Sequence, residues 1–120
     1  MPPAIRYTTA SDGVNLAFAT RGEGVPVLFM PPVPFSHLEA MWSVPGVEAW
    51  FRLLSRGALV ALYDARGTGL SDRAAADFSL ETMTGDLEAV ADRLDWPEFV
   101  LCGFFNAAPA AIAFAARHPE

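Results

Sequence analysis

The chain has 120 residues, of which 52% are hydrophobic, and its 14 acidic residues outnumber 8 basic ones to give a formal net charge of −6. This length suits one domain, residues 1–120, and the apolar fraction is ample for a core, so we expect no extended disorder. The acidic balance argues against nucleic-acid binding through phosphate charge and against binding to an anionic membrane surface.

Cysteine usage and the N-terminus bear on where the protein works. Cys102 is the single cysteine, which excludes an internal disulfide and an all-cysteine zinc site, so a reducing compartment fits better than secretion. Residues 1–6 lack a secretory leader pattern, and no apolar run approaches the length that spans a bilayer. Every basic residue is arginine, as in high-GC genomes. We therefore expect a bacterial, cytoplasmic protein.

The N-terminal third predicts three strands. Residues 5–9 and 14–20 alternate in hydropathy and are joined by Ser11-Asp12-Gly13, a pattern typical of a hairpin. Residues 25–30 form a continuous apolar run, which indicates a strand buried on both faces. The prolines that follow, at 31, 32 and 34, predict a loop.

The rest of the chain alternates between helix and strand. Helical spacing of apolar residues predicts helices near 47–54, over 80–94 with Ser79 as the N-cap, and over 107–117, with predicted strands at 58–63 and 99–102 between them. Pro109 is tolerated in the first turn of the last helix. The order predicts an α/β fold of about five strands: an N-terminal antiparallel hairpin and a mainly parallel, doubly wound sheet with flanking helices.

The junction of the fifth strand and the last helix carries the most informative motif. Residues 103–107 read Gly-Phe-Phe-Asn-Ala, where an esterase has Gly-x-Ser-x-Gly on a tight turn that presents a nucleophilic oxygen beside backbone N–H groups. Phe105 stands where the serine would be, and a phenyl ring cannot attack a carbonyl. The glycines that follow in the motif are replaced, so the turn is expected to be relaxed.

Three segments carry a family resemblance. They are Ser36–Glu39, Tyr63–Asp72, which reads YDARGTGLSD, and Gly103 through to Glu120. With these segments in this order, nearly the whole chain resembles the N-terminal half of an α/β-hydrolase. The subgroup it resembles occurs beside adenylate cyclase and transcription-regulator modules in bacteria. The resemblance implies a truncated α/β-hydrolase fold.

For catalysis, the resemblance implies that the usual triad is missing. The nucleophile falls on Phe105, and the family's acid and histidine come later than Glu120. A carbonyl or carboxylate would be held without being attacked, by backbone donors from Val33 and from the residue after the nucleophile. The expected ligand pocket comprises Val33, His37, Phe104, Phe105 and Asn106, and its expected ligand is a small acyl or aromatic molecule.

Other candidate groups have weaker sequence support. Ser36 and His37, with Glu39 nearby, are alternative catalytic candidates, although adjacent residues usually point apart and a loop-capping role is the simpler reading. Asp64 ends a strand where α/β sheets bind ligands, but we expect it to organise its loop through turn hydrogen bonds and an arginine contact. Cys102 is expected to be a buried, inert thiol. We expect no metal and no cofactor.

The same reasoning leaves one sheet edge open. The strand at 99–102 has an apolar edge without a gatekeeping charge, which predicts a homodimer or pairing with a partner chain. Three functions stay open: a silent α/β-hydrolase-like domain that binds a small ligand or a partner; a hydrolase that uses Ser36 and His37 or a site completed in an oligomer; and a structural remnant of a longer regulator.

Overall fold

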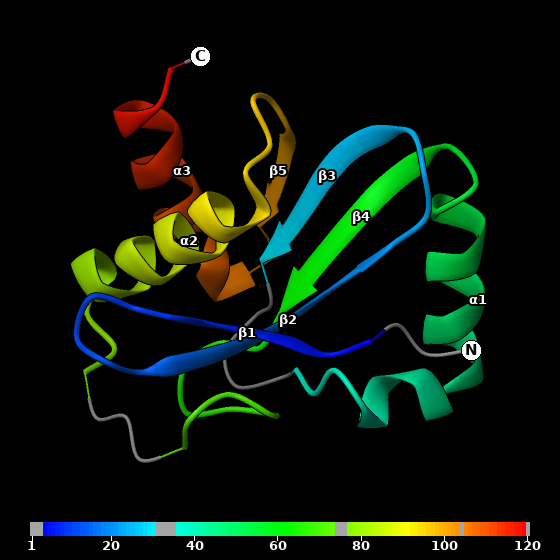
Figure 1. The fold of residues 1–120 in the computed structure, drawn as a ribbon, viewed down its shortest axis with the longest axis horizontal. Coiled ribbons are helices and arrows are strands. Elements are labelled where there is room, and N and C mark those ends of the chain that lie inside the picture. Colours follow the sequence, from blue (N-terminus) through cyan, green and yellow to red (C-terminus); the bar gives the residue numbers. More distant parts are fainter. Residues whose placement is uncertain (1–3, 31–35, 74–76, 104, 120) are drawn as a thin grey trace.

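The computed structural model describes residues 4–30, 36–73, 77–103 and 105–119, with the side chain of Phe105 outside the description. Figure 1 shows the strands lying between helices. The elements are β1 (Arg6–Thr9), β2 (Asn15–Arg21), β3 (Val25–Met30), the short helix η1 (Ala40–Ser43), α1 (Pro45–Leu54), β4 (Ala58–Tyr63), α2 (Leu80–Leu94), β5 (Val100–Gly103), the short helix η2 (Phe105–Ala107) and α3 (Ala108–Arg117).

The strands form one mixed sheet in the order β1-β2-β4-β3-β5. β1 and β2 make an antiparallel hairpin that joins the sheet antiparallel to β4, with Phe18 opposite Tyr63. β3 lies parallel to β4 on one side and to β5 on the other, with Val27 opposite both Val60 and Val100. The predicted hairpin and parallel core are therefore confirmed, and β5 lies at the edge of the described sheet.

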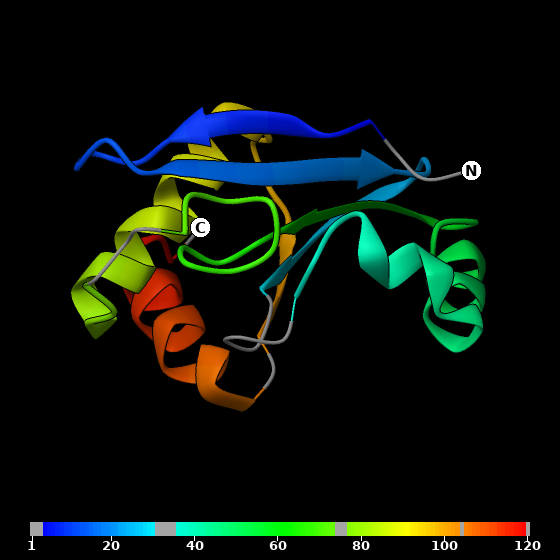
Figure 2. The ribbon, with the colours of Figure 1, turned by 90° about the horizontal axis from the view of Figure 1, so that it is seen from below.

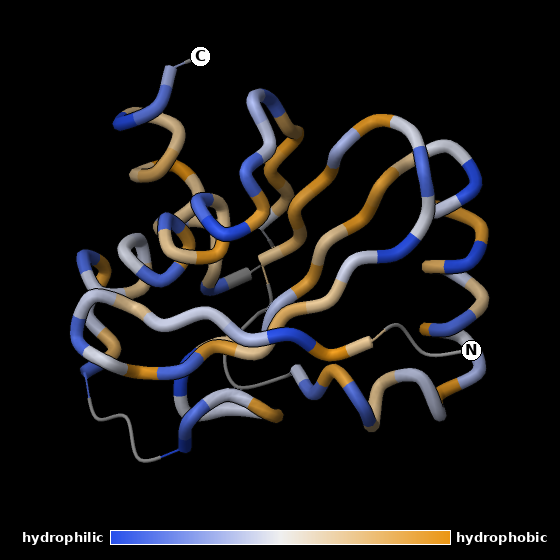
Figure 3. The backbone as a smooth tube through the Cα atoms, viewed as in Figure 1, coloured by the Kyte–Doolittle hydropathy of each residue, from blue (hydrophilic) through white to orange (hydrophobic). Residues whose placement is uncertain are grey.

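Alternate side chains of the strands feed two separate cores. On one face, Leu28 and Met30 of β3 pack with Leu87 of α2 and Phe114 of α3. On the other face, Phe29 packs with residues of η1 and α1. Figure 2 shows α2 and α3 on one side of the sheet and α1 on the other, and Figure 3 shows the apolar residues concentrated along β3 and β4. The molecule is a three-layer α/β/α structure.

The ends of the helices follow the local signals in the sequence. The Ser79 side chain accepts a hydrogen bond from the backbone N–H of Thr82, as expected of an N-cap, and α2 ends at Asp95 in the left-handed conformation. Pro109 lies in the first turn of α3, where its missing N–H leaves no helical bond unmade. None of the described helices has the length and apolar character needed to cross a membrane.

Two details differ from the sequence-based expectation. The helix η1 at Ala40–Ser43 was not predicted, because four residues are too few to show a helical period. Cys102 was expected to be buried and is half-buried, because among the described strands β5 has a neighbour on one side only.

The loop after β4 is organised by Asp64, whose side chain is fully buried. Its Oδ2 accepts hydrogen bonds from the backbone N–H groups of Leu38, at 3.1 Å, and of Leu70, at 2.8 Å. The Ser71 hydroxyl donates to the Asp64 carbonyl and accepts from the N–H of Ala17 in β2. One carboxylate thereby joins the loop after β3 to the loop after β4, which is the structural role expected from the sequence.

Gly69 is required by that arrangement. Its φ of +53° lies in the left-handed region, and a Cβ at this position would overlap the carboxylate of Asp64. The glycine therefore lets the backbone pass close enough for the N–H of Leu70 to reach the buried acid.

Arg66 forms a second buried network rather than the contact with Asp64 that the sequence had suggested. Its Nε and Nη2 each donate to the carboxylate of Asp86 in α2 at 2.7 Å, and Nη1 donates to Asp12 in the hairpin turn, also at 2.7 Å. Arg66 and Asp86 are each 2% exposed. The two acids raise the pKa of Arg66 further, whereas burial raises the pKa of the Asp86 carboxyl against the opposing effect of Arg66.

This network generates a stability prediction. Asp86→Ala leaves the buried guanidinium with Asp12 as its remaining ionic partner, and losing one member of a buried pair typically costs about 3–5 kcal/mol of unfolding free energy. Asp12→Ala removes a partner that is 46% exposed, so water replaces it and the loss is much smaller. Urea unfolding of both variants measures the difference. Equal losses would contradict the view that Asp86 holds this corner together.

Candidate functional site

The carboxyl ends of β3, β4 and β5 meet at one edge of the sheet, because the three strands run parallel. In open α/β sheets this edge is where ligands bind, in the crevice outside the strand ends. Met30, Tyr63 and Gly103 are the last residues of these strands. The candidate site therefore lies between these strand ends and the start of α3.

The connection from β5 to α3 is short and close-packed. β5 ends at Gly103, the η2 turn covers Phe105–Ala107, and α3 begins at Ala108. A Cβ on Gly103 would lie 2.9 Å from the Cβ of Ala111 and 3.4 Å from the carbonyl oxygen of Ala107. The glycine is therefore needed for the helix to pack against the strand end, as the first glycine of an elbow motif is.

Several residues expected in the pocket fall outside the description. Val33 and Phe104 are not among the described residues, and for Phe105 only the backbone is described, within η2. Asn106 is exposed in the same turn. The expected backbone donor at Val33 and the volume filled by the Phe105 ring remain predictions.

A small cavity lies beside the η2 turn. Its volume is about 200 Å³, and it is bounded by the ends of β3 and β4, the start of α2 and the start of α3. The lining residues are Met30, Tyr63, Phe78, Leu80, Met83, Asn106, Ala107, Pro109 and Ala110. Apart from the phenol and the amide, these side chains are apolar. The cavity is smaller than the pockets of drug-sized ligands, so it suits a small apolar group.

Tyr63 supplies a hydroxyl that stays neutral in this environment. The residue is 3% exposed, and burial, with a further contribution from the charge of Asp86, raises the pKa of its phenol above the ordinary value of 10.0. A neutral phenol can donate a hydrogen bond but does not act as a base at neutral pH. Tyr63 can therefore hydrogen-bond to a ligand but does not act as a nucleophile.

The structure places Ser36 and His37 in a turn that uses both side chains locally. The Ser36 hydroxyl lies 3.4 Å from the Thr68 hydroxyl, which itself donates to the carbonyl of Ala65. His37 Nδ1 accepts from the backbone N–H of Ala40 at 3.1 Å and from that of Glu39 at 3.3 Å. A ring nitrogen that accepts from its own turn is not facing the neighbouring serine. These contacts match the loop-capping alternative, and catalysis by this pair stays untested.

Sequence reasoning missed most residues around the cavity. Met30 and Tyr63 read as the last residues of buried strands, while Leu80 and Met83 fit the apolar period of a helix. Their position next to a loop at a strand end was the available signal, because parallel strands bring such ends together. Sequence alone does not reveal that these side chains leave a space between them.

Comparisons with known proteins agree with this architecture. No protein-family model matches the chain. Over 112 residues it is 30% identical to the AB hydrolase superfamily protein YisY of Bacillus subtilis, covering 93% of this chain and 40% of that protein. The chain thus spans about two fifths of the length of the curated relative it matches.

Solved structures extend the similarity to three dimensions. A hydrolase from Pseudomonas aeruginosa matches 97% of this chain and 42% of its own, with a TM-score of 0.80 and 25% identity. The esterase EaEST from Exiguobacterium antarcticum matches 93% of this chain and 40% of its own, with a TM-score of 0.77 and 27% identity. An epoxide hydrolase from Vigna radiata, 22% identical with a TM-score of 0.77 over 98% of this chain and 37% of its own, shares the fold. By sequence and fold together, the chain is similar to α/β hydrolases and has their fold.

Proposed function

We propose that this α/β-hydrolase domain binds a small acyl or aromatic ligand at the carboxyl edge of its sheet and does not hydrolyse it through the usual triad. The observation that carries the proposal is the sequence at the junction of β5 and α3, where Phe105 takes the position expected of a serine nucleophile. The packing of Gly103 against Ala111 supports this alignment, since it is the close approach that the motif's first glycine permits.

The cavity beside the η2 turn supports binding of a small ligand. Its apolar walls suit a short acyl chain or a single ring, and Tyr63 and Asn106 are the polar groups on its lining. A ligand carboxylate or carbonyl could lie toward these two residues and the start of α3, where helical N–H groups favour negative charge. These groups would orient the ligand, while Phe105, at the position expected of the nucleophile, has no oxygen to attack it.

The proposal extends to the setting in which the domain works. The resemblance to the subgroup found beside adenylate cyclase and transcription-regulator modules suits a domain that reports ligand binding instead of turning a substrate over. We therefore propose that the domain has a regulatory role in the cytoplasm of a bacterium.

Ligand binding can be tested at the mouth of the cavity. Leu80 is 52% exposed and lines the cavity, so Leu80→Glu brings a charge to its rim without disturbing the core. We expect this change to weaken binding of butyrate and of benzoate about fivefold, equivalent to about 1 kcal/mol. The measurement is titration of the methyl resonances of Met30 and Met83.

The matched control is Ile112→Glu, which adds the same charge at another exposed apolar position, in α3, that is not among the residues lining the cavity. Binding in this variant should equal that of the wild type. The proposed site is wrong if neither probe shifts the two methionine signals, or if both glutamate variants weaken binding alike.

The absence of turnover is tested separately. We expect the wild-type protein to release p-nitrophenol from p-nitrophenyl butyrate no faster than buffer, and Ser36→Ala and His37→Ala to give the same baseline. The reason is that Phe105 lacks an attacking oxygen and His37 Nδ1 is occupied by its own turn. Turnover by the wild type that disappears in either variant would instead support a hydrolase with an unconventional site.

We also propose that the edge of β5 pairs with another chain, in the simplest case a second copy of this one. Among the described strands β5 has a single neighbour, β3, and Val100 on it is 50% exposed. An unpaired edge presents backbone donors and acceptors to any strand that can align with them.

The oligomeric state tests this pairing. Light scattering behind gel filtration should give twice the chain mass of 12.9 kDa, and Val100→Lys should shift the protein to monomer, since an edge lysine opposes strand addition. Val25→Lys, at a strand residue that is 57% exposed but lies in β3, should leave the dimer intact. A monomeric wild type would overturn the homodimer.

A further inference from the structure

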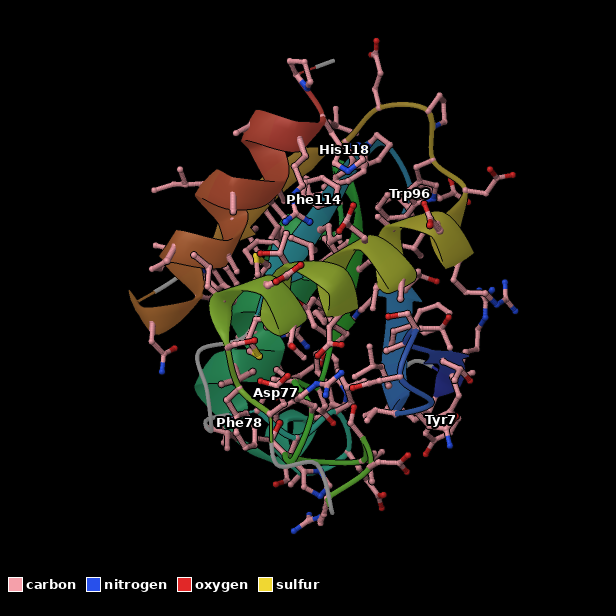
Figure 4. The ribbon with its side chains drawn as sticks, turned by 90° about the vertical axis from the view of Figure 1, so that its left-hand side faces the viewer. Tyr7, Asp77, Phe78, Trp96, Phe114 and His118 are labelled. Carbon is pink, nitrogen blue, oxygen red and sulfur yellow. The ribbon has the colours of Figure 1, made fainter. Side chains whose placement is uncertain are left out.

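A larger hollow lies at the opposite end of α2 from the cavity beside the η2 turn. Its volume is about 510 Å³, within the range of small-molecule sites, and it lies between the ends of α2 and α3 and the segment that leads into β5. Figure 4 shows Trp96, Phe114 and His118 together at this end, with Phe78 at the other end of α2. We call this hollow the aromatic groove, and it is independent of the function proposed above.

A row of rings forms the wall of the aromatic groove. The centroids of Trp96 and Phe99 are 6.3 Å apart, those of Phe99 and Phe114 are 5.9 Å apart, and those of Phe114 and His118 are 4.5 Å apart. Trp96 and Phe99 are only half-buried, so part of each ring stays open to a ligand. Ring faces carry negative electrostatic potential, and tryptophan attracts cations most strongly.

Among the described residues, the charged side chains that line the groove without an ion pair are both acidic. Asp92 and Glu98 line it and are exposed, and neither has an ion pair within the part of the chain that the structure describes. The nearby Glu88 is already paired with Arg117 at 3.0 Å and with His118 at 3.1 Å.

Arg93 follows Asp92 in the sequence and forms no ion pair with it in the described part of the chain. The Arg93 guanidinium lies 5.9 Å from the ring centroid of Phe18, on the hairpin. The aromatic groove therefore combines partly exposed rings with two carboxylates that form no ion pair with any described residue, in a chain whose net charge is −6.

We propose that the aromatic groove binds a small organic cation, an ammonium group with a methylated or otherwise apolar body. The rings take up the apolar surface and face the positive charge, while Asp92 and Glu98 complement that charge at the rim. A neutral molecule of the same shape gains only the apolar contact, and an anion is repelled. Affinity for the groove therefore depends on the charge of the ligand as well as on its shape.

The test uses choline and its neutral isostere, 3,3-dimethyl-1-butanol, which has carbon in place of the quaternary nitrogen. Titration into the ¹⁵N-labelled protein follows the indole N–H signal of Trp96, which is resolved from those of Trp42 and Trp50 by comparison with a Trp96→Phe sample. We expect choline to shift the Trp96 signal, with a dissociation constant at least about fivefold lower than that of the isostere.

Matched charge variants separate the groove from general attraction to an acidic protein. Asp92→Asn combined with Glu98→Gln should weaken choline binding about fivefold to tenfold and leave the isostere unchanged. The control, Glu23→Gln combined with Glu39→Gln, removes the same charge from exposed positions outside the groove and should bind choline as the wild type does. All four positions are exposed, so the amide spectra should show intact folds.

Three results would overturn the proposal. The first is equal binding of choline and its isostere, which would make the groove an apolar hollow without charge preference. The second is an equal effect of the two double variants, which would reduce the interaction to net charge. The third is the absence of any shift at Trp96 up to the highest choline concentration.

Discussion

The buried side chains of Asp64 and Arg66, just after β4, hold together the segments that surround the candidate site. Asp64 accepts from backbone N–H groups of the loop after β3 and of its own loop, and Arg66 joins the hairpin turn to α2. A buried polar side chain is costly unless it is hydrogen-bonded, so these contacts fix the segments that supply the partners. The positions of α2 and of the turn at His37 follow from this constraint.

The same hydrogen bonds occupy polar side chains of Tyr63–Asp72, the segment that carries most of the family resemblance. In Tyr63–Asp72, Asp64, Arg66 and Ser71 direct their polar atoms to the loop itself, to the hairpin or to α2. The segment therefore resembles that of α/β hydrolases through its architecture. In the function we propose, the absence of chemistry rests on the junction of β5 and α3, where Phe105 takes the position expected of the nucleophile and supplies a ring instead of an oxygen.

The cavity beside the η2 turn and the aromatic groove differ in the kind of ligand that they suit. The cavity beside the η2 turn is small and lined mainly by aliphatic side chains, with a phenol that burial keeps neutral. The aromatic groove is larger and is flanked by two carboxylates that form no ion pair with the described residues. Because α2 and α3 run from one hollow to the other, a ligand in either would contact the same two helices.

Most of the fold was determined by the sequence alone. The continuous apolar runs of β3 and β4, the period of α2, the Ser79 cap and the position of Pro109 all act within a few residues, and the structure confirms each of them. The hairpin also followed from local signals, at Ser11-Asp12-Gly13. Such elements are predictable because backbone geometry and hydrophobic period are properties of a short segment.

Only the tertiary structure decided how distant residues meet. Arg66 lies 54 residues from Asp12 and 20 from Asp86 along the chain, and nothing in the local pattern paired it with them instead of Asp64. The same holds for the ring row of Trp96, Phe99 and Phe114, and for the space between Met30, Tyr63 and Met83. A cavity or an ion pair depends on where whole elements pack against one another, whereas the Gly-Phe-Phe-Asn-Ala motif, on which the proposed loss of the nucleophile rests, lies in five consecutive residues.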